Sequence, residues 1–275
     1  MNYKKMIVLP IALLVVSAIY LMFLIETNNL VLDIDFKGGT QILAESERQI
    51  NEAELENVLK EYEVGVRTAR GITTYTVFIE FDASIKPENV LSTLKQSGYE
   101  FKDYSIQTIG PSLGTSFFQQ ASFALMFSFI FMAFTIFFIF KNPLPSFYLV
   151  LTVIADLTET LVFSQIFGLE LSLASFAALL LLIGYSVDDN ILLTTRVLKT
   201  TEGGTIDEKV RTSFKTGITM VGTALVALLA LFIISASIVI DQIASVLVIG
   251  LLVDLFNSWI LNVGLLQWYI ERKMK

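Results

Sequence analysis

The chain has 275 residues, of which 54% are hydrophobic and only 16% are charged. An average soluble domain carries roughly a quarter charged residues, so this composition excludes an ordinary soluble protein. The chain contains no cysteine and no histidine, which excludes disulfides and leaves proton chemistry to carboxylates, lysine, tyrosine or water. Its net charge of −7 argues against nucleic acid as a partner, and we predict neither a cofactor nor a metal site.

Six apolar runs are long enough to cross a membrane, whose hydrocarbon core of about 30 Å needs roughly 20 apolar residues. The first run is Met6–Ile25, preceded by Lys4 and Lys5. A cleaved signal peptide is the alternative for this run, although no small-residue cleavage site follows it. The other five predicted spans are about Phe117–Phe140, Phe147–Phe167, Leu171–Leu193, Thr216–Ile240 and Gln242–Ile270, with Asp241 at the last boundary.

Polar residues concentrate in residues 26–115, which carry fifteen acidic and eight basic side chains. Stretches with period-two alternation or many β-branched residues predict strands, and apolar residues at helical spacing predict helices. The predicted elements are strand Val31–Ala44, helix Asn51–Glu63, a weak strand Val64–Thr68, strand Thr73–Phe81, helix Pro87–Ser97 and strand Phe101–Ile109. This β-α-β-β-α-β order indicates a ferredoxin-like α+β domain.

The basic residues outside this domain test the span count. Six spans place all of them on one side, which the positive-inside rule identifies as cytoplasmic. They are Lys4, Lys5, Lys141, Arg196, Lys199, Lys209, Arg211, Lys215, Arg272, Lys273 and Lys275. We therefore expect a multi-pass protein of the cell membrane with both termini in the cytoplasm. Its expected parts are a tail and first span (1–25), an extracytoplasmic domain (26–115), five further spans (116–270) with a cytoplasmic loop at about 194–215, and a tail (271–275).

Ionisable side chains within the predicted spans carry the functional signal, because a charge in hydrocarbon is costly and usually faces a bundle interior. These residues are Asp156 and Glu159 in the third span, Asp188 and Asp189 in the fourth, and Asp254 in the sixth, one turn before Asn257. Such carboxyl groups could load and release protons near neutral pH. The alternatives are structural roles. For Glu159 the alternative is a place at the outer rim or a bond to a neighbouring helix. For Asp188 and Asp189 it is pairing with Arg196, and for Asp254 it is a structural hydrogen bond.

Several short motifs point to one family. Residues 34–40 read I-D-F-K-G-G-T, residues 110–114 read G-P-S-L-G, and residues 183–189 read I-G-Y-S-V-D-D, after an aspartate in the preceding span. They are similar to motifs of the SecF family of protein-export membrane proteins, and they follow in order along almost the whole chain. The motif positions are Asp35, Phe36, Gly38, Gly39, Gly110, Pro111, Gly114, Gly184, Tyr185 and Ser186.

Three details qualify this resemblance. The triplet Asp188-Asp189-Asn190 leaves either aspartate as the match for the acid of the family. The basic residue that the family often has at the start of the fifth span is lysine here, at Lys215. The sixth span, with Asp254 and Asn257 followed by a tryptophan and a further asparagine, resembles archaeal members.

The resemblance implies a polytopic α-helical protein with a six-helix RND-type bundle, paired with SecD in the lipid bilayer. It implies association with the Sec translocon and help in the export of unfolded preproteins. In the family, proton flow is thought to move the outer domains, which implies roles here for Asp156, Asp188, Asp189 and Lys215, with Asp254 as a further candidate.

We hypothesise that protonation of Asp188 or Asp189 shifts helices, and that Gly110–Gly114 passes the shift to the outer domain. That domain would grip a polypeptide by strand addition at an exposed edge. The alternatives are an RND-type transporter of small molecules or lipids and a non-energised assembly factor of the translocon. We do not expect an enzyme, because the chain has neither a P-loop nor a nucleophile elbow.

Overall fold

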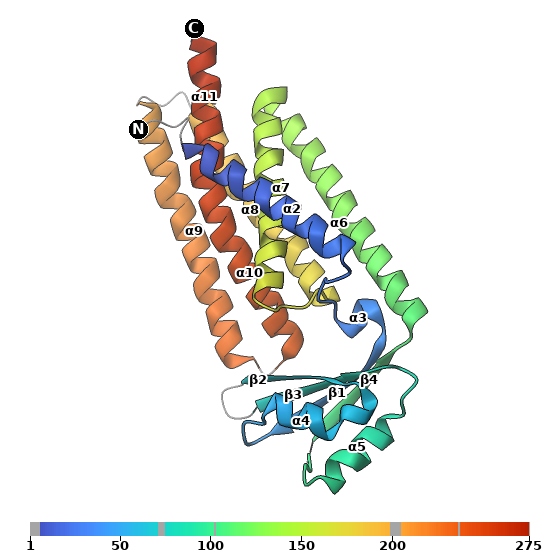
Figure 1. Cartoon of the computed structure of the whole chain (residues 1–275). Helices are drawn as coiled ribbons and strands as arrows, with labels where there is room; N and C mark the ends of the chain where they lie inside the picture. The colour runs from blue at the N-terminus through green and yellow to red at the C-terminus, as the bar shows by residue number, and fades with distance from the viewer. Residues whose placement is uncertain (1–5, 71–74, 102, 199–204, 236, 275) are drawn as a thin grey trace.

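The computed structural model describes residues 6–70, 75–101, 103–198, 205–235 and 237–274 (Figure 1). Within these residues six helices are long and apolar enough to cross a membrane, which confirms the predicted number of spans. Their bounds are α2 (Val8–Glu26), α6 (Pro111–Phe140), α7 (Pro143–Ile166), α8 (Leu173–Leu198), α9 (Ile206–Ile234) and a last helix made of α10 (Ile238–Asn257), a π-helical turn η2 (Ser258–Asn262) and α11 (Val263–Met274). Lys4, Lys5, Lys199, Lys275 and the first two residues of the predicted strand Thr73–Phe81 lie outside the described residues.

Two predicted boundaries of the spans are wrong. The fifth and sixth spans do not meet at Asp241, because α9 ends at Ile234 and Asp241 lies in the first turn of α10. The predicted cytoplasmic loop at 194–215 is largely helical. Thr205 and Glu208 form a capping box that starts α9 well before its apolar run, so the helix extends beyond the hydrocarbon-spanning length.

The outer domain contains a four-stranded antiparallel sheet with the order β2-β3-β1-β4. Its elements are β1 (Gly39–Ser46), α4 (Glu52–Val58), the short 3-10 turn η1 (Lys60–Tyr62), β2 (Gly65–Arg70), β3 (Tyr75–Phe81), α5 (Pro87–Gln96) and β4 (Tyr104–Ile109). The β-α-β-β-α-β order is the one predicted from the sequence. The fold class of a helical membrane bundle with an α+β domain is therefore confirmed.

The predicted strand Val31–Ala44 is wrong in its first half, where α3 (Ile34–Lys37) makes a single helical turn. Asp33 starts this turn, because its side chain accepts a hydrogen bond from the backbone of Asp35 at 3.2 Å. Gly38 ends it with a φ of 75°, a conformation that favours glycine. The alternating pattern of the sequence therefore includes a helical turn, which sets the direction in which the chain enters β1.

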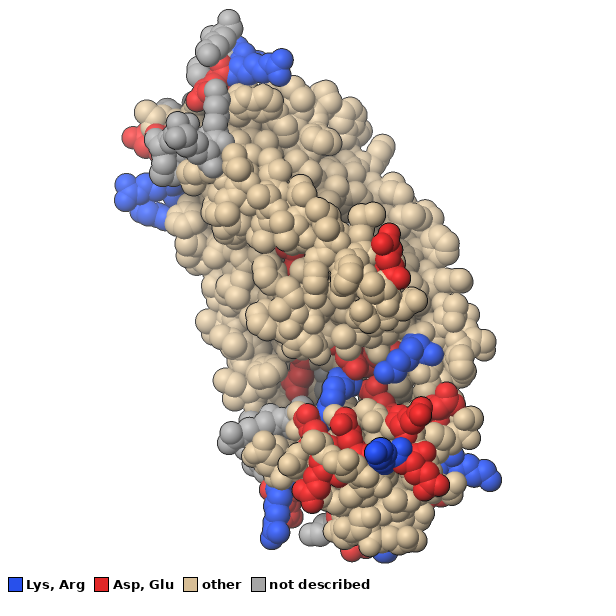
Figure 2. Space-filling model, in the orientation of Figure 1, with Lys and Arg blue, Asp and Glu red and all other residues tan. Residues whose placement is uncertain are grey.

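The sheet lies between the membrane helices and α4 with α5 (Figure 1). Fully buried aliphatic residues such as Leu55, Ile79 and Leu94 form the core between the sheet and these two helices. The opposite face of the sheet is turned toward the bundle. Charged side chains gather on the outer domain and at the far end of the bundle, while the middle of the visible surface is almost free of them (Figure 2). The start of α2 and the end of α11 lie at the end of the bundle away from the outer domain (Figure 1).

Candidate functional site

A cluster of polar side chains is buried where α7, α8 and the last helix meet. Every member is at most 2% exposed, although these helices are built mainly from aliphatic residues. The members are Asp156 and Glu159 of α7, Ser186, Asp189 and Asn190 of α8, and Asp254, Asn257, Ser258 and Asn262 of α10 and η2. We call this set the polar cluster. Positions three or four apart share one face of a helix, which explains how each helix contributes several members.

Asp156 is the most highly connected member of the polar cluster. Ser186 Oγ donates to Asp156 Oδ2 at 2.5 Å, and Asn257 Nδ2 donates to Asp156 Oδ1 at 3.0 Å. The carboxyl group of Asp254 lies against that of Asp156 and accepts a bond from Ser258 Oγ at 3.0 Å. Two acidic groups thus meet between two helices with only hydroxyl and amide donors around them.

Glu159 belongs to the same network and does not lie at the rim. Asn257 Nδ2 also donates to Glu159 Oε2 at 2.9 Å, so one amide group serves two carboxyl groups of α7. Of the two roles that the sequence left open for Glu159, the bond to a neighbouring helix is the one observed. The sequence does not reveal this role of Asn257. An uncharged amide has a smaller free-energy cost than a charge in a membrane helix, so an asparagine is a weak signal in an apolar run.

The π-helical turn η2 brings further amides into the polar cluster. In an α-helix, positions five apart, such as Asn257 and Asn262, lie about 140° apart around the axis. The wider turn rotates Asn262 toward α8, where its Nδ2 donates to Asn190 Oδ1 at 2.5 Å. Asn190 Nδ2 in turn donates to the carbonyl of Ser186 at 2.8 Å. Single π turns are frequent at functional sites, and this one completes the polar cluster.

Asp189 is buried against α9, whereas Asp188 is exposed on the neighbouring face of α8. A Cβ atom on Gly217 of α9 would lie 2.6 Å from Asp189 Oδ1 and 2.4 Å from Trp259 Cζ2, so glycine provides the space for both. Among the described residues, neither oxygen of the Asp189 carboxyl group has a hydrogen-bond partner.

The pairing of the two aspartates with Arg196 that the sequence left open is not observed among the described residues. Arg196 Nη1 donates instead to Thr216 Oγ1 at 3.0 Å. Lys215 and Tyr185 are exposed, and Gly184 has open space beside it, so these three residues lie outside the polar cluster. Ser186 is the one member of its motif that bonds to a buried carboxyl group.

The polar cluster contains more acceptors than donors. Among the described residues, buried side-chain oxygens of five of its members have no hydrogen-bond partner: those of Glu159, Asp189, Asp254, Asn257 and Asn262. An unpaired buried polar atom costs about 1–3 kcal/mol, so packing alone does not account for the set. Chains of carboxyl groups in membrane bundles are typical of proton relays.

The two glycine-rich motifs near the outer domain pack against each other. A Cβ atom on Gly38 would lie 2.8 Å from the Cα of Pro111, and one on Gly114 would lie 2.9 Å from the backbone nitrogen of Gly38. The ring of Phe36 lies in edge contact with Phe118 of α6 at 5.3 Å between centroids. Gly39 has a φ of 141°, and Gly110 directly precedes α6. The motifs thus fix the outer domain to the start of α6.

Asp35 ties the first of these motifs to α8, because its Oδ2 accepts a hydrogen bond from the backbone nitrogen of Leu173 at 3.1 Å. The N-terminal end of a helix favours a carboxylate. Burial raises the pKa of Asp35, while the bond from Leu173 works in the opposite direction.

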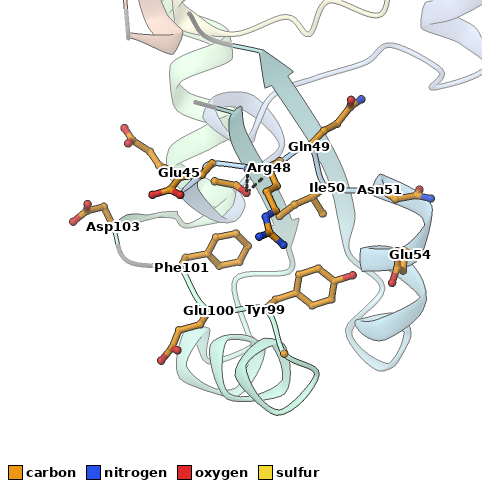
Figure 3. Close-up of a pocket in the computed structure, with 13 residues that line it drawn as sticks. Glu45, Arg48, Gln49, Ile50, Asn51, Glu54, Tyr99, Glu100, Phe101 and Asp103 are labelled. Carbon is orange, nitrogen blue, oxygen red and sulfur yellow. Dashed lines mark hydrogen bonds between the residues drawn. The ribbon is translucent and has the colours of Figure 1, made fainter. Parts of the chain in front are cut away.

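The outer domain also has an open hollow of about 580 Å³ beside the start of β4 (Figure 3). Arg48 and the rings of Tyr99 and Phe101 point toward one another across it. The acidic residues of its lining are Glu45, Glu47, Glu54, Glu100 and Asp103.

Comparison with known proteins gives consistent matches. The family model described as protein export membrane protein SecD/SecF, C-terminal, matches residues 89–272. The protein-export membrane protein SecF of Methanolacinia petrolearia is 35% identical over 98% of this chain and 94% of its own length. SecF of Pyrococcus furiosus is 39% identical over 99% of this chain and 93% of its own.

Solved structures agree with this at the level of fold. The crystal structure of SecDF, a translocon-associated membrane protein from Thermus thermophilus, superposes with a TM-score of 0.78 at 19% identity. The superposition covers 98% of this chain but only 38% of that longer one.

Proposed function

This chain belongs to the SecD/SecF family of protein-export membrane proteins, and we propose that it is a SecF-type subunit that assists protein translocation across the membrane. The observation that carries the proposal is the buried pair of Asp156 and Asp254 with its donors, inside a bundle with the fold of SecDF. Two acidic groups in contact within an apolar bundle are costly to bury, and such groups usually mark an ion or proton pathway.

A SecD-type subunit, the Sec translocon and unfolded preproteins are the partners in this proposal. The chain corresponds to 38% of a SecDF chain that is described as translocon-associated, so the remainder of that chain suggests a separate SecD partner here. Exposed apolar residues of α6 and α9, among them Phe131 and Phe232, face the lipid bilayer or this partner. The proposal orients residues 26–115 outward and both termini toward the cytoplasm, because basic residues flank the other ends of the spans.

Protons are the ions that the polar cluster transfers in this proposal. Asp189, buried beside α9, is the acid of its pair that takes part, whereas Asp188 is exposed. Transfer from Asp189 to the Asp156–Asp254 pair would change which helices repel one another. The motif joint of Gly38, Pro111 and Gly114 then passes the movement of the helices to the outer domain.

The outer domain contacts the exported polypeptide at β4, the edge strand of the sheet beside the acidic hollow. Tyr104 and Ile106 of β4 are 51% and 42% exposed, which is unusual for large side chains of a strand. An edge strand presents unpaired backbone groups to which an extended chain can add.

The test is the translocation of a preprotein into membrane vesicles that contain the complex, with and without an uncoupler. We expect Asp156→Asn and Asp189→Asn to remove most of the uncoupler-sensitive part of the rate, because asparagine cannot carry the proton. Asp188→Asn is the matched control and should translocate like the wild type. If both buried substitutions kept the uncoupler-sensitive part, the proton mechanism would be wrong. A wild-type translocation rate that does not change when the uncoupler is added would favour the alternative of a non-energised assembly factor.

A further inference from the structure

The face of the sheet that is turned toward the bundle carries an ionic contact with the membrane helices. Arg67 lies on β2, and Glu170 lies in the loop that joins α7 to α8. Arg67 Nη2 donates to Glu170 Oε2 at 2.6 Å and to Glu80 Oε1 of β3 at 2.5 Å. Both carboxyl groups are buried, so one guanidinium group is shared between an acid of the outer domain and an acid of the bundle.

The two acids are unequally supplied with donors. Glu80 also accepts bonds from Lys37 Nζ at 2.8 Å and from Gln41 Nε2 at 2.7 Å. Among the described residues, the carboxyl group of Glu170 has Arg67 as its only donor. Further charges that act on Glu170 are those of Asp33, which precedes α3, and of Lys37, the last residue of α3.

The protonation of the two acids follows from this difference. Burial disfavours the charge of Glu80, but the bonds and charges of Lys37 and Arg67 outweigh it and hold the pKa of Glu80 below its ordinary value. Burial and the nearby charge of Glu80 raise the pKa of Glu170 to about 7, because Arg67 compensates them only in part. The contact thus joins an acid that stays ionised to one that changes its charge near neutral pH.

We propose that Glu170 is a proton-controlled contact that keeps the outer domain docked on the bundle when it carries a proton and loosens the domain when it is ionised. With a proton on Glu170, its carbonyl oxygen still accepts the bond from Arg67, and the two buried acids no longer repel. Ionisation places a second negative charge in the same buried site, and separation of the domain from the bundle returns that charge to water. The inference deepens the proposed function by adding control of the movement of the outer domain.

The direction of the pH effect follows from linkage. In the separated state Glu170 is solvated and has its ordinary pKa of 4.5, whereas the docked state binds the proton more tightly. Acid therefore favours docking. Between about 4.5 and about 7, the equilibrium shifts toward separation by up to about tenfold per pH unit.

Two backbone hydrogen bonds across the same boundary provide the measurement. Asp33 N donates to Leu171 O at 2.9 Å, and Leu171 N donates to Val31 O at 2.9 Å. We would follow hydrogen exchange of these two amides by mass spectrometry, with the full chain in lipid nanodiscs between pH 5 and pH 8. After correction for intrinsic exchange, protection in the wild type should fall as the pH rises.

Three variants separate this device from a merely structural contact. Glu170→Gln should keep its protection at every pH, because glutamine cannot ionise. Glu80→Gln should shift the fall to lower pH, because Arg67 then compensates Glu170 alone. Glu100→Gln removes an exposed carboxylate of the outer domain that pairs with Lys95, and it should keep the wild-type profile.

Equal protection of the wild type at pH 5 and pH 8 would overturn the proposal. A wild-type slope in Glu170→Gln would do so as well, and an unshifted fall in Glu80→Gln would contradict the role of the shared guanidinium group. The measurement needs neither a translocon nor a proton gradient. Its failure would therefore leave the export proposal standing, and failure of the translocation assay would leave this contact intact.

Discussion

Single glycines decide how closely α9 can approach the polar cluster. Gly217 allows the carboxyl group of Asp189 and the indole of Trp259 to lie directly against the helix backbone. Small residues recur along this helix in the sequence, among them Thr216, Thr219, Gly222 and Thr223, but the sequence does not tell which position makes the contact. At Gly222, five residues later, no atom of the described residues lies within 4 Å of the place that a Cβ atom would take.

We expect Gly217→Ala to destabilise the protein by about 1–3 kcal/mol, because the added methyl group forces Asp189 or Trp259 to move. Thermal unfolding of the purified protein in detergent measures the effect. Gly222→Ala is the matched control and should unfold at the wild-type temperature or slightly above, since alanine is the better helix former. Equal unfolding temperatures of the two variants would show that α9 does not lie as close to α8 as described.

At the scale of single elements, β4 combines an open edge with exposed side chains, although strands usually protect their edges. We expect a photo-crosslinking amino acid at Ile106 to capture a polypeptide that is arrested during translocation. The same amino acid at Lys95, exposed on α5, serves as the control and should capture little, because a helix offers no free backbone edge. Mass spectrometry of the crosslinked products identifies the partner. Equal capture at both positions would argue against strand addition.

The sequence predicts elements better than it predicts their ends. The six apolar runs stand out because hydropathy is a local property that a window of residues contains completely. The predicted ends of α8 and α9 are wrong because both helices continue beyond their apolar runs. The start of α9 is set by the capping residue Thr205 and not by an apolar residue. The turn α3 escapes prediction because its residues alternate as a strand does.

The residues of the candidate site also divide into those with a local signal in the sequence and those without one. The buried aspartates are candidates from the sequence alone because a charge within an apolar run is rare, but only the structure separates Asp189 from the exposed Asp188. Asn257 and the pair of Arg67 with Glu170 are not predictable in this way, because their roles depend on residues about a hundred positions away in the chain. The residues next to an amide or a loop carboxylate in the sequence do not indicate which distant residue it contacts.

For the whole molecule, the proposed orientation has a direct test, because the natural chain has no cysteine. We expect a cysteine at Glu100 to react with an impermeant maleimide added to intact cells. A cysteine at Lys141 should react only in inverted vesicles, because the start of α7 lies at the other end of the bundle (Figure 1). Labelling is read by mass shift on a gel, and labelling of Lys141→Cys in intact cells would contradict the orientation.

The attachment of the outer domain also determines how it can move. The chain enters the sheet at β1 and leaves it at β4, and these adjacent strands lie at one side of the order β2-β3-β1-β4. Two neighbouring anchors favour rotation of the domain about the line that joins them over other movements. Arg67 sits on β2, three inter-strand spacings or about 14 Å from β4. The contact of Arg67 with Glu170, at that distance from the hinge, resists rotation with more leverage than the same contact beside the anchors.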